Sequence, residues 1–220
     1  MAEDFAVKTS DLIAALAADP KPRGMTLGRR FALALALGVL ISACAFLTMV
    51  GPRHDIAHAM TTMRFDWKFV DTVALAVPTG LLAWRLLRPD AEFGRSAIAL
   101  ALAAPAVALG LSVAMELMMV PSDLWLTKLV GSNAIHCLTL IPLLSIAPLA
   151  ALLFVMRAGA PATPWIAGAV AGLAAAGLAA TLYASNCTDD SPLFVATWYT
   201  FATAIVVTAG AIVGGRLLRW

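Results

Sequence analysis

The chain has 220 residues, of which 61% are apolar and only 13% are charged, and its net charge is +2 at neutral pH. Soluble domains average about 25% charged residues, so this composition excludes an ordinary water-soluble domain and favours a helical membrane protein. Nucleic-acid binding needs basic residues gathered on one soluble face, and here the charges lie in short segments between long uncharged runs. We therefore expect the lipid bilayer, and no nucleic acid, as the environment of this chain.

The first thirty residues form the longest polar segment, and they contain one short helical pattern. A start signal at residues 9–11 precedes the spaced apolar side chains Leu12, Ile13 and Leu16, and Asp19-Pro20 ends the pattern. A helix of roughly ten residues is shorter than the ~12 to 15 that hold in water. Its polar face lacks the Lys and Arg of a membrane-surface helix, so we expect a protein groove to cover it. The alternative is a tail without a role.

Six apolar runs follow, each close to the ~20 residues that cross a bilayer. They predict an all-α fold with six transmembrane helices in a single domain over residues 31–216, preceded by the polar segment 1–30. The predicted spans are 31–50, 69–87, 96–115, 135–156, 165–184 and 193–215. Cys44 lies in the first run, and we expect it to be a small buried side chain.

The Lys and Arg residues are unequally divided between the two sides of these spans. With the N-terminus inside, eleven lie on the inner side and four on the outer side. The four on the outer side, expected in loops, are Arg53, Arg64, Lys68 and Lys128. The positive-inside rule then predicts that both termini are cytoplasmic, in a multi-pass protein of a bacterial inner membrane.

Small residues and prolines indicate how the spans pack. Small residues four apart recur in spans five and six at Gly168, Gly172, Gly210 and Gly214. They allow close helix approach, which we expect within one chain rather than between two. Pro142 and Pro148 interrupt the fourth span just after Cys137. Each proline removes a backbone hydrogen bond and favours a kink, so this span is the best candidate for a movable element.

The reactive side chains lie on the outer side. Cys137 and Cys187 flank the hairpin of spans four and five and emerge on the same face, next to His136, Asp189 and Asp190. In the periplasm such a pair can form a lasting disulfide. Thiolate and imidazole groups also suit zinc and similar cations, so His136, Cys137 and Cys187 are candidate ligands of a transient metal ion, although their spacing matches no metal motif. A structural disulfide, a redox or metal sensor, and two thiols without a role all remain open.

The sequence does not indicate an enzyme, and we expect neither a resident cofactor nor a small-molecule substrate. It has no G-x-S-x-G, no phosphate-binding G-x-x-x-x-G-K-[ST] and no C-x-x-C motif. A small transporter or channel would use ionisable residues deep in its spans, whereas Asp71 and Glu116 are expected near span ends. A membrane thiol-redox protein would show a closely spaced cysteine pair.

One ordered series of residues resembles a known family. The series comprises residues 9–19 and then Cys137, Ile141-Pro142, Pro148-Leu149, residues 157–161 (Arg-Ala-Gly-Ala-Pro), Gly168, Gly172, Tyr183, Cys187, Asp189, Asp190, Pro192, Phe194 and Trp198-Tyr199. Together with six spans, it is similar to the NrsF family of bacterial inner-membrane negative regulators of sigma factor F.

The resemblance implies an anti-sigma factor. Such a protein holds an extracytoplasmic-function sigma factor at the membrane and releases it on an envelope signal, which includes thiol-reactive, redox or metal stress. Cys137 and Cys187 would then be the sensor pair, supported by His136, Asp189 and Asp190. The residues implied to contact the sigma factor are Asp11, Leu12, Ile13, Leu16 and Asp19.

Overall fold

The computed structural model describes residues 8–18, 24–88 and 95–219, and all regular structure in these ranges is helical. Six elements are long and apolar enough to cross a membrane, so the prediction of an all-α, six-span fold is confirmed. They are α2 (Leu27–Met49), α4 (Met63–Leu86), α5 (Arg95–Met119), α7 (Ala134–Gly159), α8 (Pro164–Ala184) and a last span that joins α9 (Pro192–Phe194), the π-helical turn η2 (Val195–Tyr199) and α10 (Thr200–Leu217).

Four shorter helices complete the described chain: α1 (Thr9–Ala17), α3 (Ile56–Ala59), η1 (Ser122–Leu124) and α6 (Trp125–Val130). Most of the long helices extend beyond the predicted spans, and α4 and α5 bring polar residues into the helix by doing so. Because α4 begins at Met63 rather than near residue 69, Lys68 lies inside a helix and not in a loop. Likewise α5 continues to Met119. The apolar runs alone therefore underestimated how far polar residues enter the helices.

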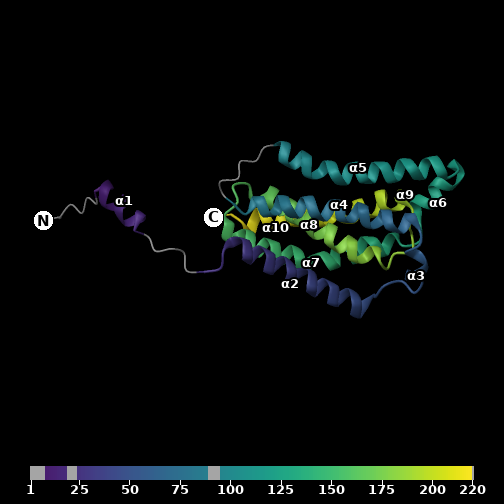
Figure 1. The fold of residues 1–220 in the computed structure, drawn as a ribbon, viewed down its shortest axis with the longest axis horizontal. Helices are drawn as coiled ribbons and strands as arrows, with labels where there is room; N and C mark the ends of the chain where they lie inside the picture. Colours follow the sequence, from purple (N-terminus) through teal and green to yellow (C-terminus); the bar gives the residue numbers. More distant parts are fainter. Residues whose placement is uncertain (1–7, 19–23, 89–94, 220) are drawn as a thin grey trace.

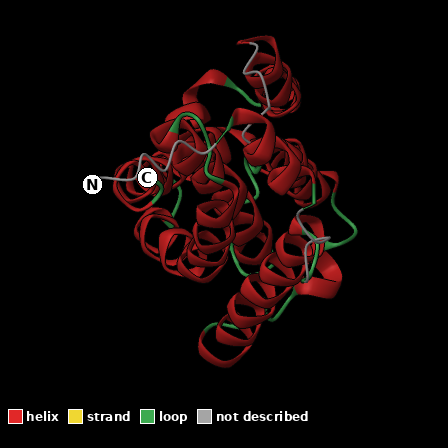
Figure 2. Cartoon of the chain, turned by 90° about the vertical axis from the view of Figure 1, so that its left-hand side faces the viewer, coloured by secondary structure: helices red, strands yellow, loops and turns green. Residues whose placement is uncertain are grey.

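The long helices lie roughly side by side, and Figure 2 shows most of them nearly end-on. The central helix is α8, which packs against α10, α4 and α7, whereas α5 lies at the edge of the bundle next to α4 (Figure 1). We call the end with α3, α6, α9 and the loop 185–191 the thiol end. The opposite end, where α2 begins and α10 finishes, is the tail end. Six crossings place the start of the first span and the end of the last span together.

Three glycines allow the close contact between α8 and α10. A Cβ added to Gly168 in α8 would overlap the carbonyl oxygen of Gly210 in α10 and would lie 2.9 Å from the Cα of Gly214. Only glycine permits this approach. The small-residue spacing in spans five and six therefore serves packing within the chain, as expected.

A second contact joins α2 to α7 at a proline. Pro148 has no N–H, so the carbonyl of Leu144, four residues earlier, lacks its helical donor. The hydroxyl of Ser42 on α2 donates to that carbonyl over 2.6 Å, and Ser42 is buried. Gly38 lies one turn away, where an added Cβ would be 2.7 Å from the Cα of Pro148. The proline thus provides α7 with a specific attachment to α2.

One expectation about burial was wrong. Cys44 is exposed on the surface of α2, where a membrane would present lipid rather than protein to it. Asp71 and Glu116, which we expected near span ends, are buried against other helices and are 7% and 3% exposed. In both cases the side chain's surroundings depend on how the helix is rotated about its own axis. Spans that are apolar on every side do not indicate that rotation.

Candidate functional site

The two thiols lie together in the interior of the thiol end. Cys137 is in the first turn of α7 and Cys187 follows α8 by three residues, and both are fully buried free cysteines. They belong to one buried cluster with Tyr183, Phe194 and Tyr199. The thiol of Cys187 also donates to the backbone oxygen of Asp189 over 3.7 Å. The α7–α8 hairpin therefore places both thiols at one end of the bundle, as the sequence predicted, and the structure also buries them together.

Asp189 fixes the loop after α8 against the start of α7. Its Oδ2 accepts hydrogen bonds from the backbone N–H groups of Ser132 and Asn133, each over 2.8 Å, and from the Asn133 side chain over 2.9 Å. Burial favours a higher pKa for Asp189, but the bonds from Asn133 and Ser132 outweigh it and lower the pKa below its ordinary value. A carboxylate beside a helix N-terminus is also favoured by the helix dipole.

Lys68 brings a buried positive charge to the thiols. Its ammonium donates to the carbonyl of Cys187 over 2.7 Å and forms an ion pair with Asp190, and its side chain is 0% exposed. Asp190 also pairs with Arg53 over 2.8 Å. Hydrogen bonding to Asp55 and then to Asp190 raises the pKa of Arg53, although burial opposes it. Charges removed from water persist only with such partners, so this network ties α4 and the loop at residue 53 to the thiol loop.

These surroundings make Cys187 the more reactive thiol. Hydrogen bonding by the Cys137 thiol, followed by the positive charge of Lys68, lowers the pKa of Cys187 to about 7, against the opposing effect of burial. A thiolate is the nucleophilic form of cysteine. The lowered pKa favours a thiolate at Cys187 beside a second thiol, which is the arrangement needed for disulfide formation.

Only some of the other predicted site residues lie near the thiols. Asp189 and Asp190 lie at the thiols, but His136 is exposed on α7. Within the described residues, no three His, Cys, Asp or Glu side chains are grouped to hold a metal ion. Asp11, Leu12 and Ile13 are exposed on α1. The side chain of Leu16 and the whole of Asp19 lie outside the described residues.

Four residues of this site were not predicted as functional: Arg53, Lys68, Tyr183 and Tyr199. Tyr183 and Tyr199 are buried beside the thiols, and in the described chain neither hydroxyl has a hydrogen-bond partner in good geometry. The sequence did carry one usable signal, because Lys68 is followed directly by an apolar run. A lysine at the start of a span needs a buried anion or an exit to water, and Asp190 is that anion.

Comparison with known proteins agrees with this architecture. The family described as NrsF, negative regulator of sigma F, matches residues 16–220. A probable anti-sigma-F factor NrsF of Azospira oryzae is 31% identical over 219 residues, covering 97% of this chain and 100% of that protein. The anti-sigma-F factor NrsF of Caulobacter vibrioides is 33% identical over 222 residues, with 97% and 100% covered. No solved structure matches.

The family match includes all six membrane-spanning elements and both buried cysteines. The relatives are covered over their full length, so the likeness is not limited to one apolar run. The chain therefore belongs to the NrsF family, the negative regulators of sigma F.

Proposed function

We propose that this protein holds an extracytoplasmic-function sigma factor at the bacterial inner membrane and releases it when an envelope signal acts on Cys137 and Cys187. The family supplies the anti-sigma role. The observation that carries the sensing role is the buried thiol pair, in which a lowered pKa makes Cys187 nucleophilic. Thiol-reactive, redox or metal stress is the class of signal that such a pair can receive.

The orientation follows from the charge distribution. Eleven Lys and Arg residues belong to the side of the tail end and four to the side of the thiol end, so the positive-inside rule places the tail end in the cytoplasm. Both termini are then cytoplasmic and the thiols face the periplasm. In this orientation the thiol end would receive a periplasmic signal, and the tail end, at the other end of the bundle, would bind the cytoplasmic sigma factor.

Oxidation changes the charge at the thiol end. The Cys187 thiolate and the Cys137 thiol give two electrons to a two-electron oxidant, the Cys137 proton passes to solvent or to the reduced oxidant, and a bond forms between the two sulfurs. The Cys187 thiolate disappears in this step, so Lys68 loses one of the negative charges beside it and keeps Asp190. The new bond also joins the start of α7 directly to the loop after α8.

The attachment of α7 to α2 offers a route to the tail end. A shift at Cys137 acts on the first turn of α7, and two prolines allow this helix to bend. The Ser42–Leu144 hydrogen bond and the Gly38–Pro148 contact then pass the shift to α2. Because α2 follows the N-terminal segment in the sequence, its displacement alters how that segment is presented.

The N-terminal segment has the surface that a partner requires. Leu12 and Ile13 on α1 are 53% and 61% exposed, and such a short helix gains stability when its apolar face enters a groove. Folding upon binding consumes part of the interaction energy, so a modest change in the bundle can shift the fraction of bound sigma factor. The contact residues we propose are Asp11, Leu12, Ile13, Leu16 and Asp19.

The decisive experiment replaces both buried cysteines with serine and measures sigma-dependent transcription under thiol-reactive stress. The double variant should repress transcription at rest, as the native protein does, and should show no induction. Cys44→Ser is the matched control, because Cys44 is exposed on α2 and is not a member of the buried thiol cluster; it should retain full induction.

Membrane levels of each variant, measured by immunoblot, separate a loss of sensing from a loss of folding. An unchanged response in a well-expressed double cysteine variant would reject the thiol pair as the sensor. Loss of resting repression at normal membrane level would instead show that the thiols are needed to hold the sigma factor.

A further inference from the structure

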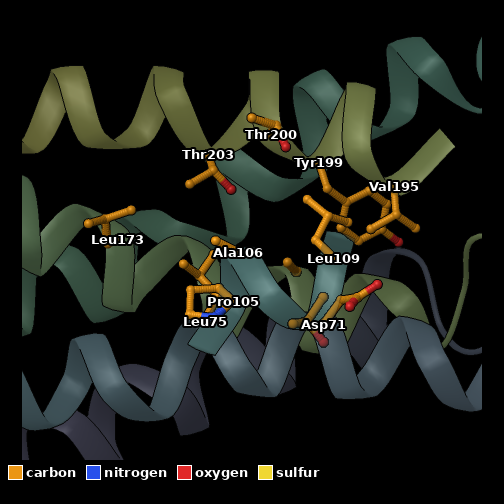
Figure 3. A pocket seen from close by; sticks show the side chains of 12 residues that line it. Asp71, Leu75, Pro105, Ala106, Leu109, Leu173, Val195, Tyr199, Thr200 and Thr203 are labelled. Atoms are coloured by element: carbon orange, nitrogen blue, oxygen red, sulfur yellow. The ribbon is translucent and has the colours of Figure 1, made fainter. Parts of the chain in front are cut away.

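A cavity lies between α4, α5, α8 and the last span, separate from the thiol pair (Figure 3). Its volume is about 220 Å³, and its walls are almost entirely apolar. In Figure 3, Asp71 and Tyr199 lie at one end of the cavity and Leu173 lies at the other. The cavity reaches the edge of the bundle, where Ala106 on α5 is exposed. It therefore has a polar end, an apolar body and a side open toward lipid.

The carboxylate of Asp71 is incompletely satisfied. The side chain is 7% exposed, and in the described chain its Oδ1 has no hydrogen-bond partner. The hydroxyl of Ser112 lies 3.1 Å from the other oxygen, but it also lies 3.0 Å from the carbonyl of Leu109 and has only one proton to donate. Asp71 thus receives at most one hydrogen bond inside a membrane span, where an unpaired acidic group is strongly unfavourable.

The charged groups nearest to Asp71 in the described structure are engaged elsewhere. Lys68, one turn earlier on α4, is held by Asp190 and the carbonyl of Cys187. Glu116, one turn beyond Ser112 on α5, pairs with Arg64 over 2.9 Å. The sequences of α8 and of residues 192–215 contain no Lys, Arg, His, Asp or Glu. The described structure therefore places no unengaged positive charge beside Asp71.

We propose that this cavity binds a membrane-soluble amine, with its ammonium group on Asp71 and its apolar part between α5 and the last span. An ammonium supplies both the opposite charge and the missing hydrogen-bond donors. The hydroxyl of Tyr199, also buried without a partner in the described chain, lies at the same end and accepts a further N–H. The volume falls below the ~300 to 1,000 Å³ of drug-sized ligand pockets, so the site suits a single alkyl chain or a small ring system.

The position of Tyr199 gives such binding a consequence. This side chain borders the cavity and also belongs to the buried cluster of Cys137 and Cys187. An amine held by Asp71 and Tyr199 fixes the tyrosine and so reduces access to the thiols. The binding site itself does not depend on the proposed release of a sigma factor.

The test measures saturable binding of radiolabelled n-decylamine to the full-length protein in phosphatidylcholine nanodiscs, with empty nanodiscs as background. n-Decanol is the neutral probe of the same length. Asp71→Asn removes the charge at nearly constant shape, and Ala106→Phe fills the cavity from its lipid-exposed side. Asp66→Asn is the matched control, because Asp66 lies on the same helix but is exposed and does not line the cavity.

We expect saturable decylamine binding to the native protein and to Asp66→Asn, at least tenfold weaker binding to Asp71→Asn and Ala106→Phe, and no saturable decanol binding. Bound decylamine should also slow thiol labelling of Cys187 in the native protein but not in Asp71→Asn. Equal decylamine binding by Asp71→Asn would overturn the proposal. So would the absence of saturable binding to the native protein, which would leave a proton as the partner of Asp71.

Discussion

The thiol end and the N-terminal segment differ in whether their side chains find partners within the chain. At the thiol end, Lys68, Asp189 and Asp190 are held by ion pairs and hydrogen bonds within the chain. On α1, by contrast, Leu12 and Ile13 expose more than half of their surface. The first region keeps its conformation until a chemical change removes a charge or adds a bond. The second leaves an apolar face that, in our proposal, the partner covers. This difference is the physical basis for assigning sensing to one region and binding to the other.

The largest effect should come from removing the buried cation of the thiol end. Lys68→Met leaves Asp190 with one partner fewer and removes the donor to the Cys187 carbonyl. Breaking a buried ion pair on one side costs about 3–5 kcal/mol, so the midpoint of thermal unfolding in detergent should fall markedly, and thiols that are buried at rest should label rapidly. Lys128→Met, at a partly exposed lysine in the last turn of α6, should change neither. A native-like midpoint for Lys68→Met would show that the network is not structural.

The next largest effect should be a loss of affinity for the sigma factor when the N-terminal segment is changed, without any change at the thiol end. Leu12→Asp places a charge where the proposed groove takes an apolar side chain. Burial of a leucine is worth roughly 1.5–3 kcal/mol, so affinity for the sigma factor should fall at least tenfold, with thermal stability of the bundle unchanged. Titration of the purified sigma factor against the nanodisc-embedded protein measures this. Ala14→Asp is the control, because Ala14 is exposed on the same helix and is not among the proposed contact residues. Undiminished affinity would move the binding surface away from this helix.

A smaller effect should come from the contact that joins the two regions. Ser42→Ala removes the donor to the Leu144 carbonyl, which Pro148 leaves without a helical partner. A buried acceptor without a donor costs about 1–3 kcal/mol. We expect normal oxidation of the thiols and a reduced transcriptional response to it. Thr48→Ala is the control on the same helix, because Thr48 is exposed and bonds only its own helix backbone. Equal responses from the two variants would exclude this route.

The smallest expected effect is a shift in the pH dependence of the labelling rate of Cys187. Because the pKa of Cys187 is lowered to about 7, its labelling rate should rise steeply up to neutral pH and level off near pH 8, whereas an ordinary thiol continues to gain reactivity beyond its pKa of about 8.5. The thiolate correspondingly stabilises the fold at high pH, and this contribution is lost as the pH falls through 7. Mass spectrometry of Cys44→Ser protein labelled with a small methanethiosulfonate assigns the rate to Cys187. A rate still rising at pH 9 would contradict the lowered pKa.

The fold was predictable because bilayer thickness fixes the length of an apolar run, and the hairpin of spans four and five necessarily brings Cys137 and Cys187 to one face. The partners of the thiols were not predictable from such runs. Lys68 reaches Cys187 only because α4 begins earlier than its apolar part and has the appropriate rotation. The surroundings of Cys44 and Asp71 likewise depend on helix rotation. Spans that are apolar on every side do not encode which face meets protein and which meets lipid.

The role of the N-terminal residues remains a prediction. Their exposed surface on α1 agrees with a binding role, but the stretch that includes Asp19 lies outside the described residues. The metal ligands proposed at His136, Cys137 and Cys187 also remain a prediction, although His136 is exposed and the thiols are buried. Two thiols alone favour disulfide chemistry over a stable metal site, which usually has four ligands.

The most direct test of the link between the two regions measures bound sigma factor and thiol state in the same sample. The protein is captured from membranes before and after treatment with diamide, the co-purified sigma factor is quantified, and the Cys137–Cys187 bond is detected by mass spectrometry. We predict that reduced protein retains the sigma factor, that protein with the disulfide has lost it, and that the double serine variant retains it under both conditions. Full retention of the sigma factor by protein that carries the disulfide would contradict the account.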